Sequence, residues 1–215
     1  MTVSVKVCGL TGDEGLAAAI DAGARYVGFV FFPKSPRHVS PAQAAALAVQ
    51  VPMGVAKVGL FVNPDDATLT ATLEEVPLDM IQLHGDESPA RVAEVRALTG
   101  LPVIKAVGIS GPADLDQLWD YGLVADMLLI DAKPPQDAAL PGGNGLAFDW
   151  RLLAGRQILK PWLLAGGLTP ENVHEAIRLT RAQGVDVSSG VESAPGVKDP
   201  DRIRRFIARA TAPVL

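Results

Sequence analysis

Short apolar runs recur along the chain, and each is followed by a polar turn and then by a helix-start signal. Most of the runs are continuous rather than alternating, which is typical of parallel strands buried on both faces. Their starts are spaced by roughly the length of one strand-plus-helix unit. The eight runs are Val3–Val7, Tyr26–Phe31, Ala56–Phe61, Met80–Leu83, Val103–Val107, Met127–Ile130, Trp162–Ala165 and Val185–Val187. The pattern predicts strands that alternate with helices.

The helix starts are marked by capping residues. Thr11 with Glu14, and Ser40 with Gln43, have the form of a capping box. A capping residue is followed by proline at Ser40-Pro41, Asn63-Pro64, Ser88-Pro89, Thr169-Pro170 and Asp199-Pro200. Proline is well tolerated at the first helical position, where its missing N–H has no helical partner. We therefore expect helices to begin at these places and to continue through amphipathic stretches such as Ala90–Leu98 and Val173–Thr180.

Eight strands alternating with about eight helices in 215 residues predict an α/β fold, a single-domain (β/α)8 TIM barrel over residues 1–215. The alternative is a doubly wound open sheet. Such a sheet more often has five or six strands and a glycine-rich first turn, and Gly9-Leu10-Thr11-Gly12 does not supply G-x-G-x-x-G. The barrel is therefore favoured.

Composition narrows the class of protein. A hydrophobic share of 48% and a charged share of 20% are those of a globular chain, which excludes a disordered class. The single cysteine cannot form an internal disulfide, and no leader or membrane span is visible, so we expect a cytoplasmic protein with no membrane partner. A net charge of −5 argues against a nucleic-acid partner but allows a small anionic ligand. The helix patterns single out no interface, so a monomer and a homodimer both stay open.

In a barrel of this kind the active site lies at the C-terminal ends of the strands. Those positions hold Cys8, the loop after Phe31, Asn63, His84, Lys105, Asp131, Gly166-Gly167 and Ser188-Ser189-Gly190, with Asp186 in the eighth strand. The two small-residue turns follow the seventh and eighth strands, which is the recurrent phosphate site of the fold. Glycine lets the backbone approach a ligand closely, and free N–H groups can bind phosphate. We therefore expect Gly166, Gly167, Ser188, Ser189 and Gly190 to bind phosphate, although a Gly-Gly pair by itself is usually only a tight turn.

Three other strand ends carry candidate side chains. The loop after the second strand is stiffened by prolines and carries Lys34 and Arg37; a guanidinium there suits a carboxylate, and a solvated basic loop is the alternative. Asp131 ends an apolar run, where partial desolvation suits it to acid catalysis, unless it only caps the next loop. His84 either lines the pocket or forms local hydrogen bonds. The histidines are not spaced for a metal site, so no metal is expected.

Cys8 is the lone thiol of the chain, in Lys6-Val7-Cys8-Gly9-Leu10-Thr11. A free cysteine is more often a small buried hydrophobe than a reactive group. Lys6 lies two residues earlier, and strand alternation puts both side chains on the same side. If that side faces the barrel interior, the ammonium would lower the pKa of the thiol.

The assembled segments resemble the phosphoribosylanthranilate isomerase family of tryptophan biosynthesis nearly end to end. The matching segments are Lys6-Val7-Cys8-Gly9-Leu10-Thr11, Gly28-Phe29-Val30-Phe31, Pro33-Lys34-Ser35-Pro36-Arg37, Gly59-Leu60-Phe61-Val62-Asn63, Gln82-Leu83-His84-Gly85, Asp131, Gly142-Gly143-Asn144-Gly145, Phe148-Asp149-Trp150, Ala165-Gly166-Gly167-Leu168 and Asp186-Val187-Ser188-Ser189-Gly190-Val191-Glu192. Each segment alone is a weak signal, but the ordered set is specific. The stretch 136–140 is long for the family.

The resemblance implies an Amadori rearrangement of N-(5-phosphoribosyl)anthranilate to 1-(2-carboxyphenylamino)-1-deoxyribulose 5-phosphate. It implies that Cys8 is the general base, Asp131 the general acid and Arg37 the partner of the anthranilate carboxylate. Lys6, His84 and Asp186 are expected to complete the pocket. The substrate's own amine serves as the electron sink, so no cofactor is expected.

Two other functions compete with this interpretation. The isomerase of histidine biosynthesis resembles it in chemistry, but that enzyme has a carboxylate in place of Cys8 and a ligand with two phosphates, whereas one phosphate site is visible here. A non-catalytic phosphosugar-binding or redox-sensing protein, with Cys8 as an oxidisable thiol, is the alternative from another class. A sensor often has a resolving cysteine, and this chain has no second one.

Overall fold

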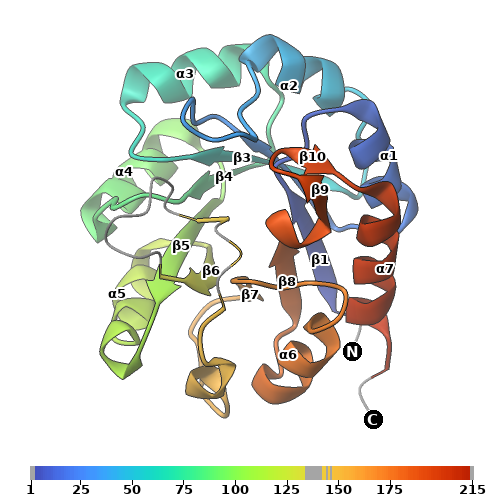
Figure 1. The fold of residues 1–215 in the computed structure, drawn as a ribbon. Helices are drawn as coiled ribbons and strands as arrows, with labels where there is room; N and C mark the ends of the chain where they lie inside the picture. Colours follow the sequence, from blue (N-terminus) through green and yellow to red (C-terminus); the bar gives the residue numbers. More distant parts are fainter. Residues whose placement is uncertain (1–2, 134–141, 144, 146, 214–215) are drawn as a thin grey trace.

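Eight parallel strands close into a barrel in the computed structural model, which describes residues 3–133, 142–143, 145 and 147–213 (Figure 1). The strands are β1 (Ser4–Cys8), β2 (Tyr26–Val30), β3 (Ala56–Phe61), β4 (Met80–Leu83), β5 (Val103–Ile109), β6 (Met127–Ala132), β7 (Trp162–Leu164) and β8 (Gly184–Val187). Each strand pairs with the next one along the chain, and β8 pairs with β1, so the sheet has no open edge. The predicted barrel and all eight predicted strands are confirmed.

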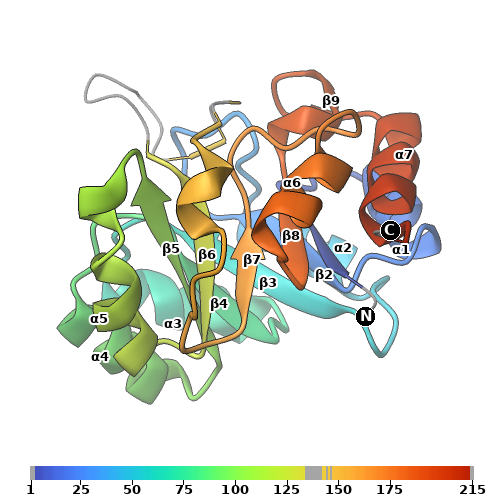
Figure 2. The ribbon, with the colours of Figure 1, turned by 90° about the horizontal axis from the view of Figure 1, so that it is seen from below.

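Helices surround the barrel, and neighbouring helices pack against one another, including the first against the last (Figures 1 and 2). The α-helices of the described residues are α1 (Asp13–Asp21), α2 (Pro41–Ala48), α3 (Asp66–Glu75), α4 (Pro89–Thr99), α5 (Gln117–Val124), α6 (Val173–Thr180) and α7 (Pro200–Thr211). Three short 3-10 helices are η1 (Pro112–Asp114), η2 (Trp150–Leu153) and η3 (Ser189–Val191). Between β6 and β7 the described residues form only η2, which packs on α6, so the expectation of about eight helices is corrected to seven α-helices in the described part.

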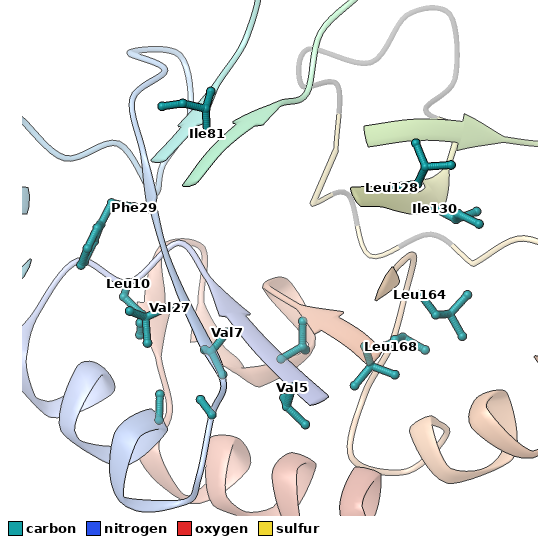
Figure 3. Close-up of a cluster of buried hydrophobic side chains, with 14 of the residues drawn as sticks. Val5, Val7, Leu10, Val27, Phe29, Ile81, Leu128, Ile130, Leu164 and Leu168 are labelled. Atoms are coloured by element: carbon teal, nitrogen blue, oxygen red, sulfur yellow. The ribbon is translucent and has the colours of Figure 1, made fainter. Parts of the chain in front are cut away.

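Strand alternation sorts the side chains into two layers. Residues such as Val5, Val7 and Ile130 point outward and form the main core between the strands and the helices (Figure 3). A smaller cluster, which includes Val58 and Leu129, fills the barrel interior. Both layers are nearly free of solvent contact, and each buried aliphatic side chain of this size contributes about 1.5–3 kcal/mol.

The predicted helix starts at Ser40, Ser88 and Asp199 are confirmed. Ser40 Oγ accepts from the backbone N–H of Gln43 at 3.2 Å, and the Gln43 side chain returns to the Ser40 N–H at 3.1 Å, which completes the capping box. Ser88 caps α4 and Asp199 caps α7, in both cases with proline at the next residue. These side chains face solvent-exposed helix ends, where the local pattern decides the structure.

The predicted starts at Thr11, Asn63 and Thr169 are wrong. α1 begins at Asp13 after an uncapped Gly12, because the Thr11 hydroxyl instead donates to Gly196 O at 3.2 Å. α3 is capped by Asp65, because Asn63 adopts φ 47° and its side chain accepts from Asp86 N at 2.9 Å.

At the third of these positions, α6 begins at Val173, because Thr169 lies in the preceding turn and donates its backbone N–H to Asn172 Oδ1 at 2.8 Å. Thr169 is thus bonded within its own turn, whereas Thr11 and Asn63 are bonded to segments that are distant in sequence.

A two-stranded antiparallel hairpin follows η3 and precedes α7. It consists of β9 (Glu192–Ala194) and β10 (Val197–Lys198), with Lys198 opposite Glu192. Gly196 in its turn has φ 81°, and a Cβ there would lie 2.3 Å from the carbonyl oxygen of Pro36. The hairpin therefore packs tightly against the loop after β2, which carries Arg37. Among the described residues no helix is long and apolar enough to cross a membrane.

Candidate active site

A pocket opens at the C-terminal end of the barrel, between the ends of the strands. The residues that line it lie at the ends of the strands or in the loops that follow them, and they come from β1, β2, β3, β4, β6, β7 and β8. The predicted site residues that line it are Cys8, Arg37, His84, Asp131, Gly166, Gly167, Asp186, Ser188, Ser189 and Gly190. Lys6 lies beneath it, fully buried, and is bonded to Asp186. Residues selected only by topology are thus brought together in one cavity.

Two residues from the strand-end set lie elsewhere. Lys105 shares the outward face of β5 with Val103 and Val107. Its ammonium binds Glu87 Oε2 at 2.7 Å and lies 5.3 Å from the ring centroid of Tyr121 on α5. This ion pair supports the loops around the site from outside the barrel.

Asn63 is the second of these residues. Its backbone N–H donates to Glu87 Oε1 at 2.8 Å, which joins the loops after β3 and β4. Asn63 therefore has a role in loop structure.

Cys8 ends β1 with its side chain in the barrel interior, in contact with Val30 and Leu60, and it is 3% exposed. Its register partner on β2 is Gly28, where a Cβ would lie 2.9 Å from the sulfur. A side chain at position 28 would displace the thiol, so glycine there leaves the sulfur its room.

The charge of the Cys8 thiolate is controlled by burial and by three neighbours. Burial raises the pKa of the thiol, Lys6 lowers it, Asp186 raises it and Lys198 lowers it, with the net pKa above the usual thiol value. The expected effect of Lys6 is present, but the expectation of a lowered thiol pKa is corrected, because burial outweighs the ammonium. Lys6 itself is fully buried; burial works against its charge, yet Asp186 at 2.8 Å and Cys8 raise its pKa.

Asp131 lies on β6 and is 8% exposed. Its Oδ1 accepts from the backbone N–H of Ala132 at 2.8 Å, and its Oδ2 lies 3.3 Å from His84 Nε2. Gln82 Nε2 lies 2.8 Å from His84 Nδ1, so the Gln82 amide selects which ring nitrogen carries the proton. His84 therefore both lines the pocket and orients the Asp131 carboxyl.

Two glycines bring backbone close to this carboxyl. A Cβ on Gly142 would lie 2.3 Å from His84 Nε2 and 3.0 Å from Asp131 Oδ2. Gly166 has φ 86°, and a Cβ there would meet Ala132 N at 2.8 Å. Only glycine leaves room for the acid at both positions. The long stretch 136–140 lies outside the described residues.

The loops after β7 and β8 approach each other at the pocket rim. Gly167 has φ 63°, and a Cβ on Gly190 would lie 1.9 Å from the carbonyl oxygen of Leu168. The backbone N–H groups of Gly166 and Gly167 donate to no other described residue, so they are available to a ligand. Main-chain donors of this kind suit an anionic group, so the predicted phosphate site at these loops stays a prediction.

Arg37 approaches the pocket from the loop after β2 and is 6% exposed, whereas Lys34 in the same loop is exposed. Its Nε and Nη2 donate to the two carboxylate oxygens of Glu192 at 2.7 and 2.9 Å. A Cβ on Gly9 would lie 2.7 Å from Arg37 Cδ, so the path of this side chain requires glycine there. The solvated-loop alternative is therefore wrong for Arg37.

Four residues that hold the site have no role predicted from the sequence: Glu192, Lys198, Gln82 and Glu87. Glu192 was the last residue of a motif, and its position five residues after β8 was the only available signal. Glu87 is a buried charge in a loop, and Lys198 is a buried charge on the two-residue strand β10, and neither position carries a periodic pattern. Their roles follow from contacts between segments that are distant in sequence.

The fold and the pocket together define a (β/α)8-barrel enzyme with its active site at the C-terminal face of the strands. A family model for N-(5'-phosphoribosyl)anthranilate (PRA) isomerase matches residues 5–209. An N-(5'-phosphoribosyl)anthranilate isomerase of Paracoccus denitrificans (strain Pd 1222) is 85% identical over 215 residues, which is 100% of each chain. The chain therefore belongs to the N-(5'-phosphoribosyl)anthranilate isomerase family, and it is an isomerase of tryptophan biosynthesis.

Solved structures agree with this placement. The crystal structure of phosphoribosyl anthranilate isomerase from Thermotoga maritima has a TM-score of 0.86 and 40% identity, covering 97% of this chain and 98% of the other. A phosphoribosyl anthranilate isomerase in complex with reduced 1-(o-carboxyphenylamino)-1-deoxyribulose 5-phosphate has a TM-score of 0.82 and 37% identity, with the same two coverages. The expected resemblance is confirmed at the level of sequence and fold.

Proposed function

We propose that Cys8 and Asp131 act as general base and general acid in the rearrangement of N-(5-phosphoribosyl)anthranilate to 1-(2-carboxyphenylamino)-1-deoxyribulose 5-phosphate. The observation that carries the proposal is that a thiol and a carboxyl group, on the non-adjacent strands β1 and β6, line one pocket together with an anion site. An acid–base rearrangement needs two proton-transfer groups at separate points around one bound substrate.

The proton transfers follow from the substrate chemistry. Asp131 protonates the ring oxygen of the ribose, and the C1–O bond breaks to give an iminium ion. The positive nitrogen acidifies the C2 proton, which the Cys8 thiolate removes, and the electron pair forms an enolamine. The enolamine then ketonises to the product: C1 takes up a proton, and the C2 hydroxyl gives up its proton as the C2=O bond forms. Proton exchange with solvent restores the Asp131 carboxyl and the Cys8 thiolate. The substrate nitrogen accepts the electrons, so this sequence needs no metal or cofactor.

The two ends of the substrate match the two ends of the pocket. The glycine-rich loops with Gly166, Gly167 and Gly190, and with Ser188 and Ser189, bind the phosphate through main-chain and hydroxyl donors. Arg37 binds the anthranilate carboxylate from the loop after β2. Lys6 and Asp186 lie under the reacting carbon atoms beside Cys8, which the electrostatic coupling of the three groups supports.

The setting of the enzyme is also part of the proposal. One domain over residues 1–215 acts on a small phosphorylated substrate in the cytoplasm, with no nucleic-acid partner, as the single cysteine and the net charge of −5 support. The chain acts as a monomer or a homodimer; a related isomerase of Thermotoga maritima is described as dimeric.

Single-residue variants test the two catalytic roles. Cys8→Ala and Asp131→Asn should each lower kcat by about 10²–10⁴-fold, because each removes one proton-transfer group. Both should still bind the reduced product analogue within a few-fold of the unsubstituted protein. Asp114→Asn is the matched control, since Asp114 is equally buried but lies outside the pocket. Turnover of Cys8→Ala or Asp131→Asn close to that of Asp114→Asn would refute the assignment.

A further inference from the structure

We propose that Glu192 is the positioning residue that fixes the Arg37 guanidinium for the substrate carboxylate, and that Lys198 balances the charge of Glu192. This inference rests on the proposed role of Arg37. Neither Glu192 nor Lys198 lines the pocket, so Glu192 acts on the substrate carboxylate through Arg37. Lys198 acts on Arg37 through Glu192, and its ammonium also donates to Ser188 O at 3.0 Å and lowers the pKa of Cys8.

The Glu192 carboxylate is held by four donors. Oε1 accepts from Arg37 Nε at 2.7 Å and from Lys198 Nζ at 2.8 Å. Oε2 accepts from Arg37 Nη2 at 2.9 Å and from the backbone N–H of Gly196 at 3.3 Å. Burial would raise the pKa of Glu192, but Arg37 and Lys198 lower it, with the net pKa below the usual value. The carboxylate is therefore ionised at neutral pH and locked in place.

A bidentate carboxylate fixes both the plane and the rotation of a guanidinium. Glu192 occupies the edge formed by Nε and Nη2, and Nη2 also approaches Gly143 O at 3.4 Å. Nη1 donates to no other residue in the described part of the chain, although it lies in a pocket-lining side chain. The fixed edge leaves Nη1 as the donor for a ligand carboxylate.

The charge of the cluster explains why Lys198 is present. Arg37 and Glu192 alone form a neutral pair, which attracts a second carboxylate weakly. Lys198, whose side chain is 3% exposed, restores one positive charge to the cluster. Burial lowers the pKa of Lys198, and Glu192 opposes that effect in part, so the protonation of this amine depends on the carboxylate. Each cation thus depends on Glu192.

The small hairpin supplies both residues in register. Lys198 on β10 lies opposite Glu192 on β9, and Gly196 in the turn packs on Pro36, one residue before Arg37. Thr11 donates to Gly196 O, which ties the same turn to the loop after β1. The hairpin therefore clamps the loop that carries Arg37 and sets the orientation of its guanidinium.

Two ligands separate positioning of Arg37 from general stability. The first is reduced 1-(o-carboxyphenylamino)-1-deoxyribulose 5-phosphate, and the second is the same molecule with a phenyl group in place of the carboxyphenyl group. For Glu192→Gln we expect the Kd of the first ligand, measured by calorimetry, to rise about tenfold to a hundredfold, the usual loss of a charge-assisted contact. The Kd of the second ligand should change less than about threefold, a difference of under 1 kcal/mol. Equal weakening of both ligands, or of neither, would overturn the proposal.

Three further variants complete the test. Arg37→Met shows whether Arg37 meets the carboxylate at all: without selective loss of the first ligand, the proposed function of Arg37 fails. Selective loss for Arg37→Met but not for Glu192→Gln overturns only the present inference. Lys198→Met should weaken both ligands, because Lys198 Nζ also donates to Ser188 O at 3.0 Å, but it should weaken the first ligand more than the second. This difference keeps the proposal testable if Glu192→Gln does not fold. Glu87→Gln is the control, since its buried pair with Lys105 does not touch Arg37, and it should show no selectivity.

Discussion

Replacement of Lys6 by methionine should raise the pKa of the Cys8 thiol and slow the reaction below that pKa. Lys6 is the first neighbour that favours the thiolate, whereas burial and Asp186 oppose it. Lys198 remains in the variant and keeps part of the favourable effect. Loss of an opposite charge next to a titrating group shifts its pKa by about 1–3 units. The ascending limb of kcat/KM against pH, on the acidic side of the profile, should therefore move to higher pH by about 1–3 pH units.

The size of the rate effect follows from the thiolate fraction. The thiol pKa already lies above its usual value, so at neutral pH each unit of further increase lowers the thiolate fraction tenfold. We expect kcat/KM at pH 7.5 to fall by about ten- to a thousandfold. Stopped or continuous assays across about pH 6–10 would measure the limb directly. The gap between the two curves should be constant at low pH and should narrow only above the pKa of the unsubstituted thiol.

The same variant loses stability for a separate reason. It leaves Asp186 buried without the ammonium at 2.8 Å, and breaking one side of a buried pair costs about 3–5 kcal/mol. For a chain of this size that is a fall in Tm of about 6–20 °C. The pKa of Lys6 is raised in the folded state, so this contribution is complete below the ordinary lysine value of 10.5 and is lost only as pH rises through the higher folded value. Unfolding at pH 7 therefore measures all of it.

Lys105→Met separates the two effects. It breaks a comparable buried ion pair, in which Lys105 Nζ lies 2.7 Å from Glu87 Oε2 and the two side chains are 2% and 1% exposed. Lys105 faces the helices, however, and does not act on the Cys8 thiol. It should lower Tm by a similar amount and leave the ascending limb of kcat/KM in place. An unmoved limb in Lys6→Met, with the Tm lowered as in Lys105→Met, would refute the electrostatic role of Lys6.

Two further predictions concern the phosphate loops and a helix cap. Gly190→Ala places a Cβ 1.9 Å from Leu168 O, so the two loops must separate, and the Kd of the reduced product analogue should rise about tenfold to a hundredfold in a calorimetric titration; an unchanged Kd would remove these loops from the phosphate site. Ser40→Ala removes the α2 cap and should cost about 0.5–2 kcal/mol in urea unfolding, with kcat unaffected. A cost near zero for Ser40→Ala would show that Gln43 alone holds the helix start.

The barrel could be predicted from the sequence because each strand is buried on both faces. A strand of this kind appears as an apolar run in the sequence, and this pattern does not depend on which strands pair with it. Helix starts were predictable where the capping side chain meets only its own helix, as at Ser40 and Ser88. They failed at Thr11 and Asn63, where the side chain bonds to a distant loop, a contact invisible in local pattern. Boundaries set by such contacts need the folded chain.

The pocket was predictable because the topology brings every strand end to one face. Cys8, Asp131 and the glycine turns could be found from position alone. The roles of Glu192 and Lys198 could not be found in this way, because both residues lie in a hairpin that interrupts the strand–helix repeat. Glu192 binds Arg37 across a separation of 155 residues, and Lys198 binds Glu192. The net rise in the Cys8 pKa was also hidden, since it depends on the degree of burial and not on the neighbours alone.

Closure of the barrel by the β8–β1 pair has a consequence for folding during synthesis on the ribosome. Lys6 meets Asp186, and Ser188 Oγ donates to the carbonyl oxygen of Cys8 at 3.1 Å, so both contacts join residues 180 positions apart. While β8 is still inside the ribosome, one edge of β1 is unpaired. Asp186 does not yet hold the Lys6 ammonium beside Cys8, and the loop with Ser188 is not yet next to the thiol. Until β8 has been synthesised, β1 therefore has an open edge that can pair with another strand, and neither contact can form.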